Sequence, residues 1–297
     1  MRPTSVEEAA AFLTEASAAG RRVRIGSDLE TDGLARVLEH EAGDLTCTVE
    51  AGIRLSALQE TLRTAGQRLS LDPPGDPSIG ACLAGRLSGP LSHRFGTPRD
   101  LVLGVTLVLG DGTIASSGGK VVKNVAGYDL GKLVCGSEGR LALVARVSLR
   151  LHPLPQSAVT LVVGTDDTAG VVRELGRKRL EPSALDILHP GRVALLLEGS
   201  ESAVRQQLDE ARALVGGVES DASVWAESRE RQGQALGRVR FVPADLANTL
   251  TTLDEAVVRP SAGIAHVPYR VGGVPSAAAR RLHRALAERL DPAGVLA

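Results

Sequence analysis

The spacing of hydrophobic and polar positions changes several times along the chain, and it predicts alternating helices and strands. A Ser/Thr cap followed three residues later by glutamate predicts a helix over residues 5–19, which Gly20 ends. Apolar positions then alternate over the short strand 22–25 and the strand 45–50. Residues 55–65 return to helical spacing. This mixture predicts an α+β fold.

The middle of the chain contains two long apolar strands with glycine-rich turns between them. Residues 101–109 form an apolar run, and the Gly-Asp-Gly turn at 110–112 predicts a hairpin that returns over residues 113–115. A second strand is expected over residues 141–151. Three prolines and a glycine in residues 72–77 exclude regular structure and predict a rigid loop.

Pro153 and Pro155 mark the best candidate for a domain boundary, because they end the second strand and a new pattern follows. We therefore expect domains at residues 1–153 and 154–297. The second domain is expected to contain strands 159–164, 193–198, 238–242 and 263–269, and helices 168–177, 203–215, 245–256 and 276–290. This alternation predicts a second α+β layer.

Composition narrows the classes of partner. The net charge of −1 and the 2% aromatic content argue against a nucleic-acid binder, which needs a basic surface and stacking side chains. The three cysteines are far apart and the six histidines show no paired spacing, so no disulfide framework and no metal site are expected. No apolar run has the length of a membrane helix and no secretory signal opens the chain, so we expect a cytoplasmic protein.

Two glycine motifs resemble nucleotide-binding loops but lack their context. Gly110, Gly112 and Ala115 match a dinucleotide fingerprint, yet the following serines and glycines would break the helix that it requires. Residues 127–132 are one residue short of a phosphate loop and lack its Ser/Thr. Neither a Rossmann domain nor kinase-like chemistry is expected. The remaining glycine-rich turns fit backbone that approaches a ligand closely, or simply a cluster of turns.

An ordered series of motifs carries a family resemblance. These motifs are residues 71–74 (LDPP), 78–80 (SIG), 87–90 (LSGP), 94–96 (RFG), 99–104 (RDLVLG), 109–112 (LGDG), 118–130 (GGKVVKNVAGYDL) and 136–139 (GSEG). The series resembles the FAD-binding domain of the p-cresol methylhydroxylase (PCMH) and vanillyl-alcohol oxidase flavoproteins, and among them the FAD-binding subunits of glycolate oxidase.

The resemblance implies a PCMH-type FAD-binding domain of two α+β subdomains, followed by an α+β cap domain. It implies non-covalent FAD and an oxidoreductase subunit that converts glycolate to glyoxylate and is active only in a complex, with a catalytic flavoprotein and an iron–sulfur subunit as partners. Any membrane association would be peripheral and through these partners. The cofactor-binding residues that it implies are Gly26, Ser27, Pro74, Ser78, Ile79, Gly80, Ser88, Gly89, Gly139 and Val144.

Two departures from the family pattern keep an alternative open. The family places a glycine-rich loop after the first strand, where successive N–H groups bind the diphosphate. Here residues 24–28 read RIGSD, so glycines are lost and Asp28 brings a negative charge. Ala81 and Ala142 also replace glycines. The alternative is a non-catalytic structural subunit that has lost tight FAD binding.

The catalytic residues stay unknown at this point. Lys123, Asn124, Tyr128 and Asp129 form a polar cluster that could belong to an active site. We favour a local role, in which Asn124 and Asp129 bond the turn and cap the short helix after it.

Overall fold

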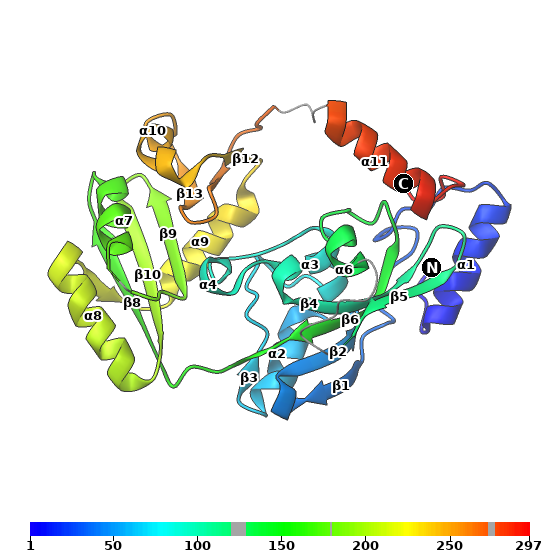
Figure 1. Ribbon diagram of the computed structural model, residues 1–297, viewed down its shortest axis with the longest axis horizontal. Coiled ribbons are helices and arrows are strands. Elements are labelled where there is room, and N and C mark those ends of the chain that lie inside the picture. The colour runs from blue at the N-terminus through cyan, green and yellow to red at the C-terminus, as the bar shows by residue number, and fades with distance from the viewer. Residues whose placement is uncertain (120–128, 179, 273–276) are drawn as a thin grey trace.

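The computed structural model describes residues 1–119, 129–178, 180–272 and 277–297. It contains two α+β domains, each built on an antiparallel sheet (Figure 1). The expected α+β class is confirmed. In the described part of the chain, no helix has both the length and the apolar character needed to cross a membrane.

The first sheet has five strands in the order β1-β2-β6-β4-β5. These strands are β1 Val37–Glu41, β2 Thr46–Glu50, β4 Val102–Val108, β5 Ile114–Gly118 and β6 Leu143–Arg150. The helical segments around it are α1 Val6–Ala18, η1 Ala42–Asp44, α2 Leu55–Arg63, α3 Ile79–Ala84, α4 Ser92–Phe95, α5 Pro98–Leu101 and α6 Leu130–Val134. Side chains of β6 divide between two cores, because Val144 packs in one and its neighbours Leu143 and Ala145 in the other. A register shift against β4 follows, and beyond it Val147 packs in the same core as Val144.

The predicted hairpin is confirmed, and it excludes the dinucleotide helix. Strands β4 and β5 pair from Val108 opposite Ile114 onward. Gly112 has φ +86°, and a Cβ there would lie 1.9 Å from Thr14 Oγ1, so only glycine fits this turn.

The second sheet has seven strands in the order β11-β8-β10-β9-β13-β14-β12. They are β8 Ser157–Gly164, β9 Ala184–His189, β10 Arg192–Gly199, β11 Val218–Ser220, β12 Gly237–Arg240, β13 Ala256–Arg259 and β14 Ile264–Val267. A separate antiparallel pair consists of β3 Gln67–Arg68 and β7 His152–Pro153. It lies in the first domain, close to the point where the chain continues into the second.

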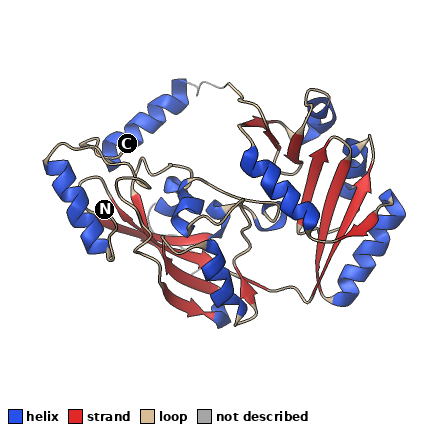
Figure 2. Ribbon diagram, turned by 180° about the vertical axis from the view of Figure 1, so that it is seen from behind, coloured by secondary structure: helices blue, strands red, loops and turns tan. Residues whose placement is uncertain are grey.

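Helices cover both faces of this second sheet. α7 Thr168–Gly176, α8 Glu201–Val215 and α10 Leu246–Leu250 pack on one face, and the exposed η2 Pro243–Asp245 leads into α10. The opposite face is covered by α9 Ser223–Gln234, whose Val224 and Trp225 pack against that face. Figure 2 shows α9 on the side that is turned toward the first domain, and Gln232 Nε2 donates to the Ser88 carbonyl there, 2.8 Å away.

Several local predictions were wrong or incomplete, and strands β1, β9 and β11 were not predicted. The helix expected over residues 245–256 ends at Leu250, and β13 begins at Ala256. Residues 22–25 form only isolated bridges, because Val23 pairs with Leu296 and Ile25 with Leu29. The pattern also missed α9, whose buried face holds only Val224, Trp225 and Ser228 among many charged residues.

The C-terminal residues return to the first domain. After α11 Ala277–Leu290, the Asp291 carboxylate accepts from the N–H groups of Val295 and Leu296 at 2.9 and 2.7 Å. Both of these residues are buried in the core that contains α1. We keep residue 153 as the proposed domain boundary. The C-terminal segment follows the second domain in sequence but packs against the first.

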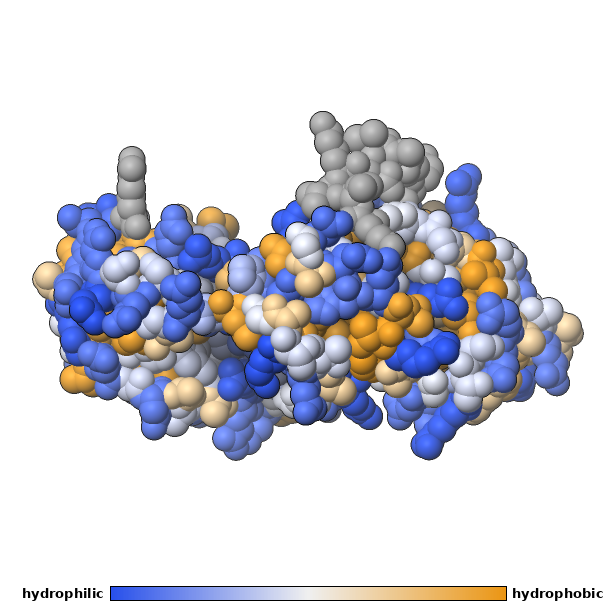
Figure 3. Space-filling model, turned by 90° about the horizontal axis from the view of Figure 1, so that it is seen from below, coloured by the Kyte–Doolittle hydropathy of each residue, from blue (hydrophilic) through white to orange (hydrophobic). Residues whose placement is uncertain are grey.

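The surface seen from below is mostly polar, and hydrophobic residues gather in a patch over the first domain (Figure 3).

Candidate functional site

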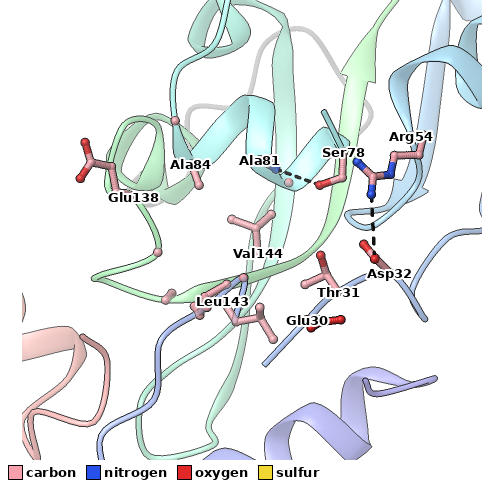
Figure 4. A pocket seen from close by; sticks show the side chains of 16 residues that line it. Glu30, Thr31, Asp32, Arg54, Ser78, Ala81, Ala84, Glu138, Leu143 and Val144 are labelled. Carbon is pink, nitrogen blue, oxygen red and sulfur yellow. Dashed lines mark hydrogen bonds and ion pairs between the residues drawn. The ribbon is translucent and has the colours of Figure 1, made fainter. Parts of the chain in front are cut away.

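A cavity of about 410 Å³ opens in the first domain between three chain segments. These segments are residues 25–32, α3 with the residues just beyond it, and residues 138–144. Arg54 and Ser78 close one side (Figure 4). The cavity is lined by Ile25, Gly26, Glu30, Thr31, Asp32, Arg54, Ser78, Gly80, Ala81, Ala84, Gly85, Glu138, Gly139, Ala142, Leu143 and Val144.

Small residues form much of the cavity wall. Gly26, Gly80, Gly85 and Gly139 alternate with alanines around it. Gly26 has φ +95°, and a Cβ there would meet no atom within 4 Å, so this backbone faces open space. Such walls allow a large ligand to approach the main chain closely.

Three of the described residues that line the cavity are carboxylates, and each has an arginine partner. Glu30 pairs with Arg2 and Glu138 with Arg140. Asp32 Oδ2 lies 3.9 Å from Arg54 Nη2. The cavity is therefore close to electrically neutral despite its acidic groups.

The family model described as "FAD binding domain" matches residues 1–118, which contribute most of this cavity. This part of the chain is therefore similar to PCMH-type FAD-binding domains. Its small-residue walls and neutralised carboxylates fit a dinucleotide.

The chain is similar to several oxidoreductases. Glycolate oxidase subunit GlcE of Escherichia coli is 31% identical over 201 residues, covering 66% of this chain and 56% of that protein. The mitochondrial D-lactate dehydrogenase (cytochrome) 1 of Saccharomyces cerevisiae is 31% identical over 188 residues, which are 61% of this chain and 32% of that protein. Glycolate oxidase subunit GlcD of Bacillus subtilis is 33% identical over 162 residues, or 52% of this chain and 34% of the relative. The chain thus spans about half of GlcE and a third of the other two.

A solved structure of alkyldihydroxyacetonephosphate synthase shares the fold of both domains. It superposes with a TM-score of 0.76 over 99% of this chain and 74% of its own, at 16% identity. At that identity the likeness concerns the fold alone.

The loop expected to bind the diphosphate closes on itself. The Arg24 carbonyl accepts from the N–H groups of Ser27, Asp28 and Leu29 at 3.3, 2.9 and 3.3 Å. The Gly26 N–H donates to the Leu29 carbonyl at 2.9 Å. Asp28 Oδ2 accepts from the Arg24 N–H at 2.9 Å, so this carboxylate belongs to the loop's own bonding and is not among the cavity-lining groups.

The first turn of α3 is also bonded internally. The N–H groups of Ile79 and Gly80 donate to the carbonyls of Ile53 and Ala51, at 3.0 and 2.6 Å. The Ser78 hydroxyl accepts from the Ala81 N–H at 3.2 Å and caps the helix. A Cβ on Gly80 would lie 3.0 Å from the Ala51 carbonyl oxygen, so glycine here lets α3 pack on the chain after β2.

The structure brings half of the sequence-predicted site residues to this cavity, namely Gly26, Ser78, Gly80, Gly139 and Val144. Ser27 lies in the self-bonded loop, and Ile79 is a core residue only 2% exposed. Sequence reasoning missed Arg54 and Asp32, because nothing local distinguishes them from surface charges.

The remaining three predicted residues lie at the boundary with the second domain. The Ser88 carbonyl is bonded to α9, and a Cβ on Gly89 would lie 1.8 Å from the Asp72 carbonyl oxygen. Pro74 lies beside Gly233 at the end of α9, where an added Cβ would be 3.2 Å from Pro74 Cβ.

Of the polar cluster at residues 123–129, Lys123, Asn124 and Tyr128 lie outside the described residues. Asp129 accepts from the Lys132 N–H at 3.0 Å and caps α6, so the local role expected for it is confirmed.

The second domain presents a basic face toward the first. Strand pairing sets Arg238 opposite His266, and Arg259 Nη1 lies 3.4 Å from His266 Nε2. Burial, together with Arg259 and Arg238, lowers the pKa of His266 to about 3, so its imidazole is neutral near pH 7.

Arg238 carries an uncompensated charge on this face. Burial and the charges of Arg240, Arg259 and Arg86 hold its pKa below the usual value, and Arg86 belongs to the FAD-binding domain. Arg259 is paired with Asp186, with Nε 3.4 Å from Oδ1. Within the described ranges, Arg86, Arg238 and Arg240 take part in no ion pair. This face can therefore attract an anion.

Proposed function

We propose that the chain is a FAD-dependent oxidoreductase subunit that acts on the hydroxyl-bearing carbon of a small 2-hydroxy acid, glycolate, within a glycolate oxidase complex. The observation that carries this proposal is the FAD-binding domain, in a chain similar to GlcE over 201 residues. FAD, when bound, supplies the acceptor for the electrons removed from the substrate.

The cofactor would bind non-covalently in the cavity of the first domain. Gly26, Ser78, Gly80, Gly139 and Val144 are the residues that would contact it. Neither a histidine nor a cysteine is found among the described lining residues, which supports the absence of a covalent link. Ser27 and Ile79 would act by shaping the loop and α3.

The basic face of the second domain would hold the substrate carboxylate. Arg238 is the leading candidate, because its charge has no carboxylate partner within the described ranges and guanidinium groups bind carboxylates in a bidentate manner. The neutral His266 adds no charge there, and we assign no catalytic base.

The partners in this proposal are a second, catalytic flavoprotein subunit and an iron–sulfur subunit. We expect the FAD-loaded chain alone to show no appreciable glycolate or D-lactate oxidation with a dye acceptor, and the reconstituted complex to turn over. Cofactor released by heat should run as FAD on chromatography. Release of FMN would contradict the cofactor assignment, and substantial turnover by the chain alone would contradict the accessory role.

The alternative is a structural subunit of the same fold that has lost tight FAD binding. The self-bonded loop at residues 24–29 favours this alternative, because its N–H groups are already engaged. Purified protein that stays free of flavin after reconstitution with excess FAD would select it.

A further inference from the structure

The two backbone features that could hold a diphosphate have few free donors. In the loop at residues 24–29, the N–H groups of Gly26, Ser27, Asp28 and Leu29 all bond to carbonyls within the loop. The first three N–H groups of α3 are likewise bonded to protein acceptors. These two features therefore offer a diphosphate few hydrogen bonds, and a charged side chain nearby can supply both charge and donors.

Arg54 is the one basic side chain among the described residues that line the cavity. It precedes α2 as its N-cap residue, and its Nη1 donates to the Asp76 carbonyl at 3.1 Å. Its side chain is 55% exposed, and its Nη2 lies 3.9 Å from Asp32, which is long for an ion pair. Figure 4 shows the guanidinium and Asp32 facing each other beside Ser78 at the cavity wall.

This arrangement leaves Arg54 free to exchange partners. The exposed and long contact with Asp32 contributes little stability, so a doubly charged ligand can compete for the guanidinium. Asp32 is itself 51% exposed and can be solvated once Arg54 turns away. Other nearby arginines are less suited, because Arg2 and Arg140 pair closely with Glu30 and Glu138.

We propose that Arg54 binds the diphosphate of FAD, in place of the glycine-rich loop, and that Asp32 is the partner which the diphosphate displaces. This inference rests on the proposed binding of FAD. A planar guanidinium offers two parallel N–H donors to phosphate oxygens, whereas the N–H groups of Gly26 to Leu29 in the loop are already bonded.

The test compares Arg54→Gln with Arg63→Gln, which removes an exposed arginine at the other end of the same helix. Dissociation constants are measured for FAD, ADP and riboflavin, with circular dichroism to establish equal folding. Arg54→Gln should raise the dissociation constants for FAD and ADP by about tenfold or more, as expected for loss of a charge-assisted bond. The dissociation constant for riboflavin should stay within about twofold of the wild-type value. Arg63→Gln should match the wild type for all three.

Two further variants sharpen the result. Arg54→Lys should bind FAD more tightly than Arg54→Gln, because it keeps the positive charge. Asp32→Asn should bind FAD more tightly than the wild type, because it removes the competing carboxylate. Unchanged FAD and ADP binding in Arg54→Gln, or an equal loss of riboflavin, would overturn the inference.

The ADP measurement separates this inference from the proposed function. A wild-type chain that binds ADP through Arg54 but no flavin would refute the flavoprotein proposal and keep the diphosphate site. A chain that binds FAD equally with and without Arg54 would refute the diphosphate site at Arg54 and keep the flavoprotein proposal.

Discussion

At the scale of single residues, the bonding partners of each carboxylate decide what its charge does. Asp28 and Asp32 lie four residues apart, yet Asp28 bonds its own loop while Asp32 faces the cavity. Repulsion of a diphosphate, which the sequence suggests for Asp28, therefore concerns Asp32 more directly.

Asp72 shows how burial changes a residue at the domain boundary. Its side chain is 18% exposed, and it accepts from the Leu91 N–H at 3.0 Å and lies 3.8 Å from Arg229. Burial raises the pKa of Asp72 to about 7, although Arg259, the Leu91 N–H and Arg229 oppose the shift. The ionised form is thus disfavoured in the folded protein.

This shift predicts a pH-dependent effect of Asp72→Asn. Because the folded pKa lies above the ordinary value, the wild type loses stability as pH rises from about 4 through 7. Asparagine does not ionise, so the Asp72→Asn variant does not lose stability in this way. The unfolding free energy of the variant, relative to the wild type, should therefore rise by an amount on the order of 2 kcal/mol between pH 5 and pH 8. Urea denaturation at both pH values measures it, and a difference that is constant with pH would show that Asp72 stays ionised.

At the scale of elements, the cavity depends on how closely α3 packs on the chain after β2. Gly80 permits this packing, with its N–H donating to the Ala51 carbonyl at 2.6 Å. Since α3 also forms one wall of the cavity, a displacement of this helix alters the site.

Gly80→Val should therefore reduce both stability and flavin occupancy. The added side chain would collide with Ala51 and cost about 1–3 kcal/mol through overpacking. Gly66→Val is the matched control, because Gly66 has φ +67° with no atom near its Cβ position and lies outside the cavity. Its strain should cost about 1–2 kcal/mol without loss of flavin. Flavin absorbance per folded chain measures the outcome, and equal losses in both variants would remove the special role of Gly80.

At the scale of the whole molecule, the two domains are joined by polar contacts as well as by the chain. Arg68 of β3 forms two bonds to Glu198 of β10, at 2.8 and 2.5 Å, with side chains only 15% and 9% exposed. This pair sits between the FAD-binding domain and the second domain and helps to set their relative position.

Breaking this pair should destabilise the protein far more than breaking a surface pair. Arg68→Ala would leave the Glu198 charge buried without its partner, at a cost of about 3 kcal/mol. Arg205→Ala removes an exposed partner of Glu201 within α8 and should cost about 0.5 kcal/mol or less. Denaturant unfolding of both variants provides the measurement, and similar costs would mean that Glu198 is solvated after the change.

The sequence by itself determined the features that depend on near neighbours. The Ser5 cap of α1, the β4–β5 hairpin with its glycine turn and the Asp129 cap of α6 all follow from residues within a few positions. The motif series also led to the FAD-binding domain. Only the tertiary structure decided that the loop at residues 24–29 bonds itself and that Arg54 faces the cavity. The physical reason is that the cavity is assembled from segments as far apart as Ile25 and Val144, which long-range strand pairing brings together. No local pattern therefore reports which charges meet there.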